Sequence, residues 1–114
     1  MKKVYIIDDD RNIVESMSIV LKAHGYGVDA QYDEKAVVEN LVAKKPDVVI
    51  LDLMMPIVTG WQVLEEMRQD PELGKIPVII LTAVSQDMPT GATAILRKPF
   101  DINELLAILK SEVN

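Results

Sequence analysis

The stretch that decides the fold is Val4-Tyr5-Ile6-Ile7-Asp8-Asp9-Asp10, in which apolar and aromatic residues run directly into three consecutive aspartates. An apolar run without alternation is typical of a parallel strand that is covered on both faces. Adjacent carboxylates repel each other, and each one raises the cost of ionising the next. The acidic end of this strand therefore needs a cation that offsets the repulsion, or side chains that point in different directions.

Further apolar runs of the same kind follow along the chain. With the first run, they cover residues 4–7, 48–51, 78–81 and 94–96. A weaker candidate, residues 26–31, alternates apolar residues with polar or small ones, and this pattern favours an edge strand. The sequence thus predicts a sheet of five short strands.

Segments with helical spacing of apolar residues lie between the predicted strands. Aspartates that precede three of them are placed as N-caps: Asp10, Asp33 and Asp101. We expect Gly25 to be the C-cap of the first helix. The second helix is predicted to carry Ala36, Val37 and Leu41 inward and to stop before Pro46. Another helical pattern covers residues 60–68. Strands that alternate with helices predict right-handed crossovers and a parallel sheet with helices on both faces.

The predicted fold class is α/β, a flavodoxin-like, doubly wound parallel sheet of five strands in the order 2-1-3-4-5. In such sheets ligands bind at the carboxyl ends of the strands, where the order reverses between the first and third strands. Asp8 and Asp9 end the first strand, and Asp52 ends the third. Topology alone therefore brings these three carboxylates to one cleft.

Three carboxylates in one cleft are costly unless a cation neutralises them. Oxygen ligands with room for water suit Mg²⁺ better than a soft metal. Taken alone, the three consecutive aspartates are explained slightly better as a turn and a helix cap. Asp52 favours the metal site instead, because it ends the predicted buried strand in "VVILDLMMP" and no turn is expected before Pro56.

Composition narrows the class of protein. The 114 residues fit one domain with a single core, and no apolar run is long enough to cross a membrane. The formal net charge of −6 argues against a general nucleic-acid surface. The absence of cysteine excludes disulfides and thiolate metal sites. We therefore expect a cytoplasmic protein without direct contact to nucleic acid or membrane.

Four motifs, in this order and on these elements, resemble the receiver domain of bacterial two-component response regulators. They are Asp8-Asp9 after the first strand, "LDLMMPIVTG" at 51–60, "PVIILTA" at 77–83 and "LRKPF" at 96–100. The resemblance covers essentially the whole chain. It implies that residues 1–114 form a single receiver domain without an effector domain. It also implies no enzymatic activity beyond self-phosphorylation and slow self-dephosphorylation.

The resemblance further implies the roles of individual residues. Asp52 would accept a phosphoryl group from a sensor histidine kinase or a phosphotransfer protein, while Lys98 and Thr82 would bind phosphoryl oxygens. The Lys98–Pro99 bond would be cis. The implied Mg²⁺ ligands are Asp8, Asp9, Asp52 and the backbone carbonyl of Met54. Met54 and Val84, both apolar, flank the path of attacking water, which predicts slow loss of the phosphoryl group.

The sequence departs from the family at two points. Receivers usually carry an aromatic residue three positions before the lysine, and here that residue is Ile95. Where the family fits a whole fourth helix, only residues 84–90 separate Ala83 from Gly91. We expect this helix to be reduced or absent. In the family, the fourth helix belongs to the surface that usually dimerises and contacts output partners. We expect this chain to pass its signal on by contact with an unknown downstream protein, with a homodimer as a further option.

Other functions are compatible with parts of the sequence. A pseudo-receiver that acts as a constitutive interaction module is favoured by the missing helix and opposed by the retained site residues. A haloacid-dehalogenase-type phosphohydrolase would need a second aspartate two residues after Asp52, where this chain has Met54. A flavin protein of this fold would need a phosphate loop rich in Ser, Thr and Gly after the first strand, and the chain has none.

Overall fold

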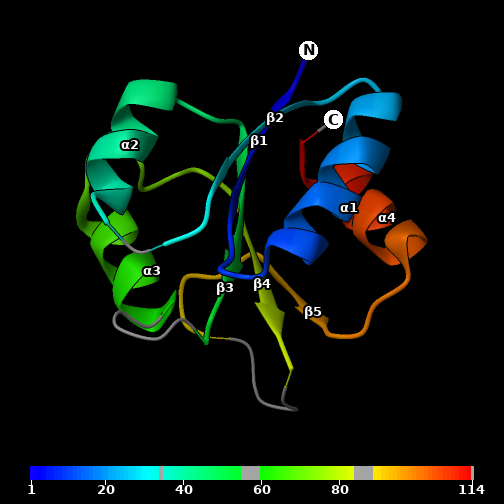
Figure 1. Ribbon diagram of the computed structural model, residues 1–114. Helices are drawn as coiled ribbons and strands as arrows, with labels where there is room; N and C mark the ends of the chain where they lie inside the picture. Colours follow the sequence, from blue (N-terminus) through cyan, green and yellow to red (C-terminus); the bar gives the residue numbers. More distant parts are fainter. Residues whose placement is uncertain (34, 55–59, 84–88, 114) are drawn as a thin grey trace.

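The computed structural model describes residues 1–33, 35–54, 60–83 and 89–113. Parallel strands form one five-stranded sheet in the order β2-β1-β3-β4-β5 (Figure 1). The strands are β1 (Lys3–Ile7), β2 (Gly27–Gln31), β3 (Val48–Asp52), β4 (Val78–Thr82) and β5 (Ala94–Arg97). All residues of β3 and β4 are buried, which explains their unbroken apolar sequences. The predicted fold class and strand order are confirmed, with β2 at one edge.

Helices cover both faces of the sheet. In Figure 1, α2 and α3 lie on the left of the sheet, and α1 and α4 lie on its right. The helices are α1 (Arg11–Ala23), α2 (Val37–Lys44), α3 (Gly60–Gln69) and α4 (Ile102–Val113). Two apolar clusters form the core, one on each face, because successive residues of a strand point to opposite faces. Ile7 packs in the cluster with α2 and α3, whereas Ile6 packs in the cluster with α1 and α4.

The connection from β4 to β5 contains no helix among the residues that the structure describes there, 83 and 89–93. This agrees with the predicted loss of the family's fourth helix. Residues 84–88, which make up most of the short segment, lie outside the described residues. The helix labelled α4 therefore follows β5. None of the described helices combines the length and the apolar character that a membrane span requires.

Helix α1 begins at the predicted cap. The Asp10 carboxylate accepts hydrogen bonds from the backbone N–H groups of Asn12 and Ile13 at 3.0 and 3.2 Å. Gly25 follows the C-cap residue His24 with φ of 91°, a conformation that glycine adopts without strain. The C-cap is therefore His24, one residue before the predicted Gly25.

Helix α2 begins later than the sequence predicts. Asp33 is not its N-cap, because its carboxylate accepts from the N–H of Lys35 and the helix starts only at Val37. The buried Gln31 side chain donates to the carbonyls of Asp33 and Lys35 at 2.8 and 2.6 Å, which holds this stretch as a loop. Ala36, predicted to point inward, is exposed and has a left-handed backbone conformation.

Candidate functional site

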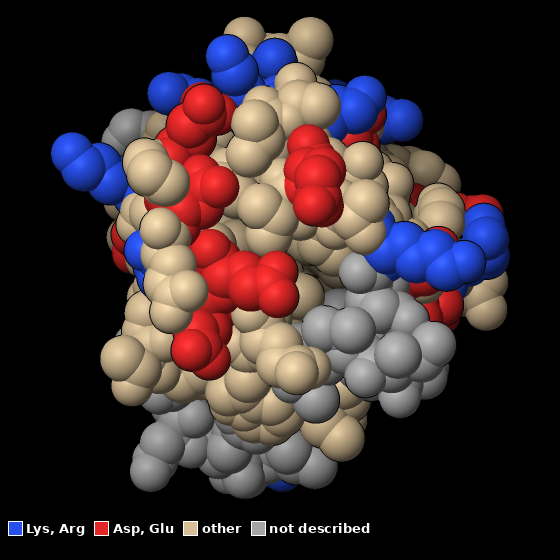
Figure 2. Space-filling view, turned by 90° about the vertical axis from the view of Figure 1, so that its left-hand side faces the viewer, with Lys and Arg blue, Asp and Glu red and all other residues tan. Residues whose placement is uncertain are grey.

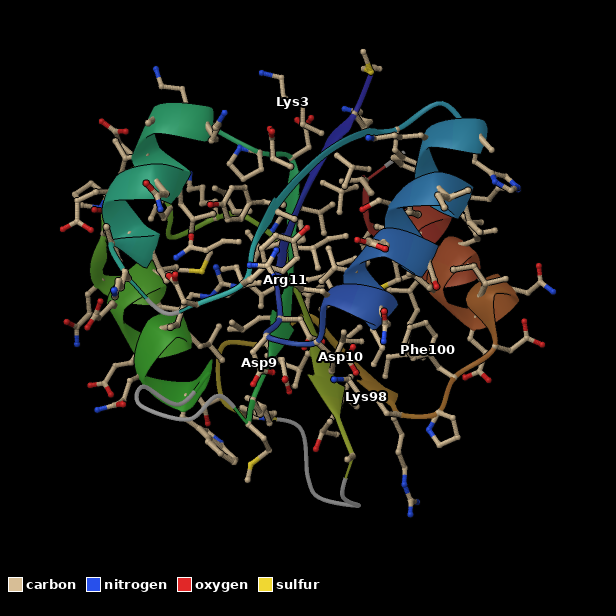
Figure 3. The ribbon with its side chains drawn as sticks, viewed as in Figure 1. Lys3, Asp9, Asp10, Arg11, Lys98 and Phe100 are labelled. Carbon is tan, nitrogen blue, oxygen red and sulfur yellow. The ribbon has the colours of Figure 1, made fainter. Side chains whose placement is uncertain are left out.

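The predicted acidic residues meet at the carboxyl ends of β1 and β3. Asp8 follows β1 and is fully buried, and Asp52 is the last residue of β3 and only 4% exposed. Asp9 is exposed beside them. One carboxylate oxygen from each of these residues can be chosen so that all three lie within 4.8 Å of one another. Figure 3 shows Asp9 and Asp10 at the same end of the sheet as Lys98.

Backbone N–H groups orient the two buried carboxylates. Oδ1 of Asp8 accepts from the N–H of Asp10 at 2.9 Å, and Oδ1 of Asp52 accepts from the N–H of Met54 at 3.1 Å. The Asp10 carboxylate turns away to cap α1. Three consecutive aspartates are thus tolerated because one is buried and hydrogen-bonded, one faces solvent and one binds a helix N-terminus.

Lys98 connects the two buried carboxylates. Its Nζ lies 2.9 Å from Oδ2 of Asp8 and 3.6 Å from Oδ2 of Asp52. The following Lys98–Pro99 bond is cis, as predicted. Burial lowers the pKa of Lys98, but the hydrogen bond to Asp8 and the charges of Asp8 and Asp52 outweigh it, so that its pKa lies above the ordinary value. Lys98 is therefore a permanent cation at this site.

The Asp52 carboxyl is hard to ionise in the protein without metal. Burial raises its pKa to about 6, and the neighbouring charge of Asp8 acts in the same direction. The hydrogen bond from the Met54 N–H and the charge of Lys98 oppose this rise without cancelling it. An additional cation beside Asp52 would favour its ionised form.

Thr82 occupies the equivalent position on the next strand. It ends β4, is 1% exposed, and its backbone carbonyl accepts from the Lys98 N–H at 2.7 Å. The structure thus brings Asp8, Asp9, Asp52 and Lys98 together and places Thr82 at the neighbouring strand end. The metal-binding role of the Met54 carbonyl remains a prediction. The Met54 side chain is 58% exposed.

Two features of the site were not foreseen in the sequence. One is the direct pairing of Lys98 with Asp8, since the sequence predicts only a phosphoryl oxygen as the partner of Lys98. The other is Arg11, whose guanidinium carbon lies 4.1 Å from the centre of the Tyr32 ring, a cation–π contact. A cation that directly follows three aspartates was the available signal for this second feature.

The receiver domain model of response regulators matches residues 4–110. The chain is 38% identical to the DNA-binding dual master transcriptional regulator RpaA of Synechocystis sp., over 97% of this chain and 48% of that protein. It is 33% identical to the response regulator ArlR of Staphylococcus saprophyticus, over 97% of this chain and 52% of that protein. The chain thus spans about half the length of these curated relatives.

Solved structures share the fold over nearly the full chain. The chemotaxis protein CheY4 of Vibrio cholerae superposes with a TM-score of 0.90 at 29% identity, covering 98% of both chains. The response regulator TrrA of Thermotoga maritima, solved in complex with Mg²⁺ and BeF, gives a TM-score of 0.87 at 30% identity, covering 97% of this chain and 98% of that chain. Fold, strand order and family match agree, and the chain belongs to the response regulator receiver domain family, the signalling modules of two-component systems.

Proposed function

We propose that this chain is a phosphoacceptor receiver, in which Asp52 accepts a phosphoryl group from a phosphohistidine in a Mg²⁺-dependent reaction. The observation that carries the proposal is the position of the Asp52 carboxylate. It lies in one cluster with Asp8 and Asp9, and its Oδ2 is 3.6 Å from the Lys98 ammonium. A nucleophile, a set of metal ligands and a fixed cation are the parts that phosphoryl transfer needs.

The acidic cluster fits Mg²⁺ by the chemistry of its donors. All of its side-chain donors are carboxylate oxygens, and the exposure of Asp9 leaves room for water ligands. We propose that Asp8, Asp9, Asp52 and the Met54 carbonyl hold the ion. When bound, Mg²⁺ would neutralise negative charge on the transferred phosphoryl oxygens. It would also offset the repulsion between Asp8 and Asp52, which contributes to the raised pKa of Asp52.

The reaction itself uses groups of this chain. A carboxylate oxygen of Asp52 forms a bond to phosphorus, while the bond from phosphorus to the donor's imidazole nitrogen breaks and its electron pair stays on that nitrogen. The Lys98 ammonium, which is bound to Asp8, would pair with one phosphoryl oxygen. The Thr82 hydroxyl, at the neighbouring strand end, would donate to another.

This chain has an apolar surface beside the site, to which we propose that a phosphodonor protein binds. A groove of about 290 Å³ lies between α1 and the segment after β5, and Lys98 forms part of its wall. Its other lining residues are Ile13, Ser16, Met17, Val20, Pro99, Phe100 and Ile102. We propose that a sensor kinase or phosphotransfer protein binds here, since contact at this groove would bring a phosphohistidine close to Asp52.

We propose that residues 1–114 act as one receiver unit, which passes the signal on by contact with a downstream protein. DNA binding is named for the relative RpaA, of which this chain matches about half. The acidic net charge of −6 favours a protein partner over DNA.

Beryllofluoride, a stable mimic of a phosphoryl group on a carboxylate, tests the proposal directly. With Mg²⁺ present, we expect saturable changes in the amide spectrum centred on Asp52, Thr82 and Lys98. The Asp52→Asn variant should show none of them. Unchanged spectra of the native chain, or equal changes in the variant, would refute Asp52 as the acceptor.

A further inference from the structure

A second concave site lies at the end of the molecule opposite the acidic cluster. In Figure 1, the N-terminus, the end of α1 and the end of α4 lie together at this upper end, where the strands begin. A pocket of about 230 Å³ is found there, lined by Lys2, His24, Gly25, Tyr26, Leu106 and Lys110. A strand rises about 3.3 Å per residue, which places Lys2 roughly 20 Å from Asp8. The pocket is therefore separate from the proposed phosphoacceptor site.

All charged side chains that line this pocket are basic. Lys2 precedes β1, His24 is the C-cap of α1, and Lys110 lies in the last turn of α4. Within the described part of the chain, no salt bridge joins any of them to an acid. Single lysines near helix C-termini commonly offset the helix dipole. Here, however, basic groups from three segments converge on one pocket, so an anion would meet positive charge that no described carboxylate compensates.

Tyr26 adds a hydroxyl group without a protein partner. The residue is only 9% exposed, and its ring packs in the core cluster beneath α1 and α4. None of the described residues forms a hydrogen bond with its hydroxyl, and no fully buried side-chain oxygen among them lacks a partner. The Tyr26 hydroxyl must therefore reach the surface, and the pocket is a surface that Tyr26 lines. Buried tyrosines usually pair this group, so a free one beside basic side chains is available to a ligand.

Backbone contacts hold the lining residues in place. The Gly27 N–H donates to the Lys2 carbonyl at 2.8 Å, which fixes the N-terminal segment beside the turn after α1. His24 Nδ1 lies 2.9 Å from the Val20 carbonyl oxygen, so Nε2 is the free nitrogen of this ring. A Cβ added to Gly25 would meet no atom within 4 Å, which shows open space at this turn.

The negative end of the α1 dipole is already compensated. The carbonyl groups of its last turn would otherwise repel an anion, but they accept from the N–H groups of the three residues that follow the helix. These hydrogen bonds, at 3.0 or 3.1 Å, join the carbonyls of Val20, Leu21 and Lys22 to the N–H groups of His24, Gly25 and Tyr26. The basic side chains therefore determine the charge of the pocket.

Positive charge is concentrated at this end of the molecule. In Figure 2, which shows the α2–α3 side, Lys and Arg side chains gather along the upper rim, and a band of Asp and Glu side chains lies below it. The cluster of Asp8, Asp9 and Asp52 lies at the opposite end of the sheet. An anion is thus repelled from the acidic end and attracted to the end that holds the pocket.

We propose that this pocket binds a phosphate group, either as free phosphate or as the monoester of a small molecule. A phosphate monoester carries nearly two negative charges at pH 7, which the Lys2 and Lys110 ammonium groups would match. The Tyr26 hydroxyl would donate to one of its oxygens. Leu106 and the Tyr26 ring would contact the remainder of a monoester. This binding requires neither Mg²⁺ nor phosphorylation of Asp52.

The test uses the full chain in chelator without a phosphodonor, so its outcome is independent of the proposed function. Inorganic phosphate and phenyl phosphate are the probes, and sodium chloride at the same ionic strength is the matched control. We expect phosphate to cause saturable changes in the amide signals of residues 24–26 and 106–110. Chloride should need at least about tenfold higher concentration, and the signals of Asp8, Asp52 and Lys98 should not change.

The two probes distinguish the two forms of the ligand. Phenyl phosphate carries an apolar ring that could cover Leu106 and the Tyr26 ring. Tighter binding of phenyl phosphate would assign the pocket to a phosphate monoester, whereas equal binding would assign it to free phosphate.

Variants separate this pocket from general electrostatic attraction. Lys2→Gln with Lys110→Gln should weaken phosphate binding about tenfold or more. Lys45→Gln with Lys75→Gln is the matched control, because it removes two positive charges at exposed positions elsewhere and should leave binding unchanged. Tyr26→Phe should weaken binding about fivefold, as expected for one hydrogen bond. It should not change the free energy of unfolding without ligand, since the hydroxyl has no partner among the described residues.

Four results would overturn the proposal. One is a response to phosphate no stronger than the response to chloride. Another is an equal loss of binding in the two double lysine variants, which would indicate general attraction to a basic surface. The third is native phosphate binding by Tyr26→Phe. The last is a set of phosphate-induced changes centred on Asp52 and Lys98, which would place the anion at the other end of the sheet.

Discussion

Asp8, Asp9 and Asp10 differ in burial and in bonding partners although they are adjacent in sequence. Asp8 is the residue that most constrains the site, because its two oxygens bind the Asp10 N–H and the Lys98 ammonium. Its fixed negative charge acts on Asp52 across the cleft. The ionised form that this arrangement disfavours is therefore that of Asp52, the residue proposed to react.

This cost has a measurable dependence on pH. Burial raises the folded-state pKa of Asp52 from 3.8 to about 6, so the folded protein binds this proton more tightly than the unfolded chain. The contribution of this proton to the free energy of unfolding is fully present below pH 3.8, and it is lost as pH rises through about 6. With metal removed by chelator, Asp52→Asn should therefore be more stable than the native chain at pH 7, by up to about 3 kcal/mol.

Urea denaturation of both proteins between pH 4 and 8 measures this difference. Asparagine keeps the shape of the side chain and an oxygen for the Met54 N–H, and all other carboxylates are common to both proteins. The advantage of the variant should shrink toward pH 4. An advantage that does not change with pH, or a less stable variant at pH 7, would contradict the assigned pKa.

We also expect single residues to determine the lifetime of the proposed phosphoryl group. The Met54 side chain is largely exposed but cannot orient a water molecule, since a thioether is at most a weak acceptor. Val84, the other residue predicted to flank the water path, lies outside the described residues. We predict slow hydrolysis, and the double change Met54→Asn, Val84→Glu should accelerate it about tenfold. Decay of the phosphorylated mass after removal of the donor gives the rate, and an unchanged rate would rule out this explanation.

Among the helices, α1 depends most clearly on one cap. Asp10 accepts hydrogen bonds from two N–H groups of its first turn. Asp10→Ala should cost about 1 kcal/mol of unfolding free energy, whereas Asp10→Asn, which keeps the accepting oxygen, should cost much less. Thermal or urea unfolding of the two variants checks this. Equal losses would mean that the charge at the helix N-terminus, and not the hydrogen bond, stabilises α1.

The start of α3 is pressed against the end of β3. A Cβ added to Gly60 would lie 2.7 Å from the Asp52 carbonyl oxygen and 2.7 Å from Cα of Leu53. Because both contacts are with backbone, Gly60→Ala should destabilise the protein by about 3 kcal/mol. Gly27→Ala is the matched control, since its nearest neighbour is the flexible Met1 sulfur at 3.2 Å. Similar unfolding free energies for both variants would show that α3 can shift away from β3.

At the scale of the whole molecule, the sheet was predictable because its inner strands β1, β3 and β4 are buried on both faces and therefore read as unbroken apolar runs. The strand order then placed Asp8, Asp9 and Asp52 together without any knowledge of side-chain positions. The start of α2 was not predictable in this way. It depends on Gln31, whose buried amide accepts from the Tyr5 hydroxyl and holds the loop that follows β2.

The pairing of Lys98 with Asp8 was equally beyond sequence reasoning. The two residues are 90 positions apart, and nothing in either motif indicates which carboxylate the ammonium will approach more closely. The distances of 2.9 and 3.6 Å depend on how β5 and β1 are positioned around β3 and β4. Topology predicts that Lys98 lies at a strand end near both carboxylates. Which of Asp8 and Asp52 its ammonium approaches more closely depends on the three-dimensional positions of the side chains.

The central claim is that Asp52 is a Mg²⁺-dependent phosphoacceptor, and the intact mass of the chain after incubation with acetyl phosphate tests it most directly. The account predicts a gain of a single phosphoryl group that requires Mg²⁺ and is absent from Asp52→Asn. A gain that persists in Asp52→Asn, or that forms equally well in chelator, would contradict it. So would a native chain that gains no mass from acetyl phosphate and does not respond to beryllofluoride with Mg²⁺.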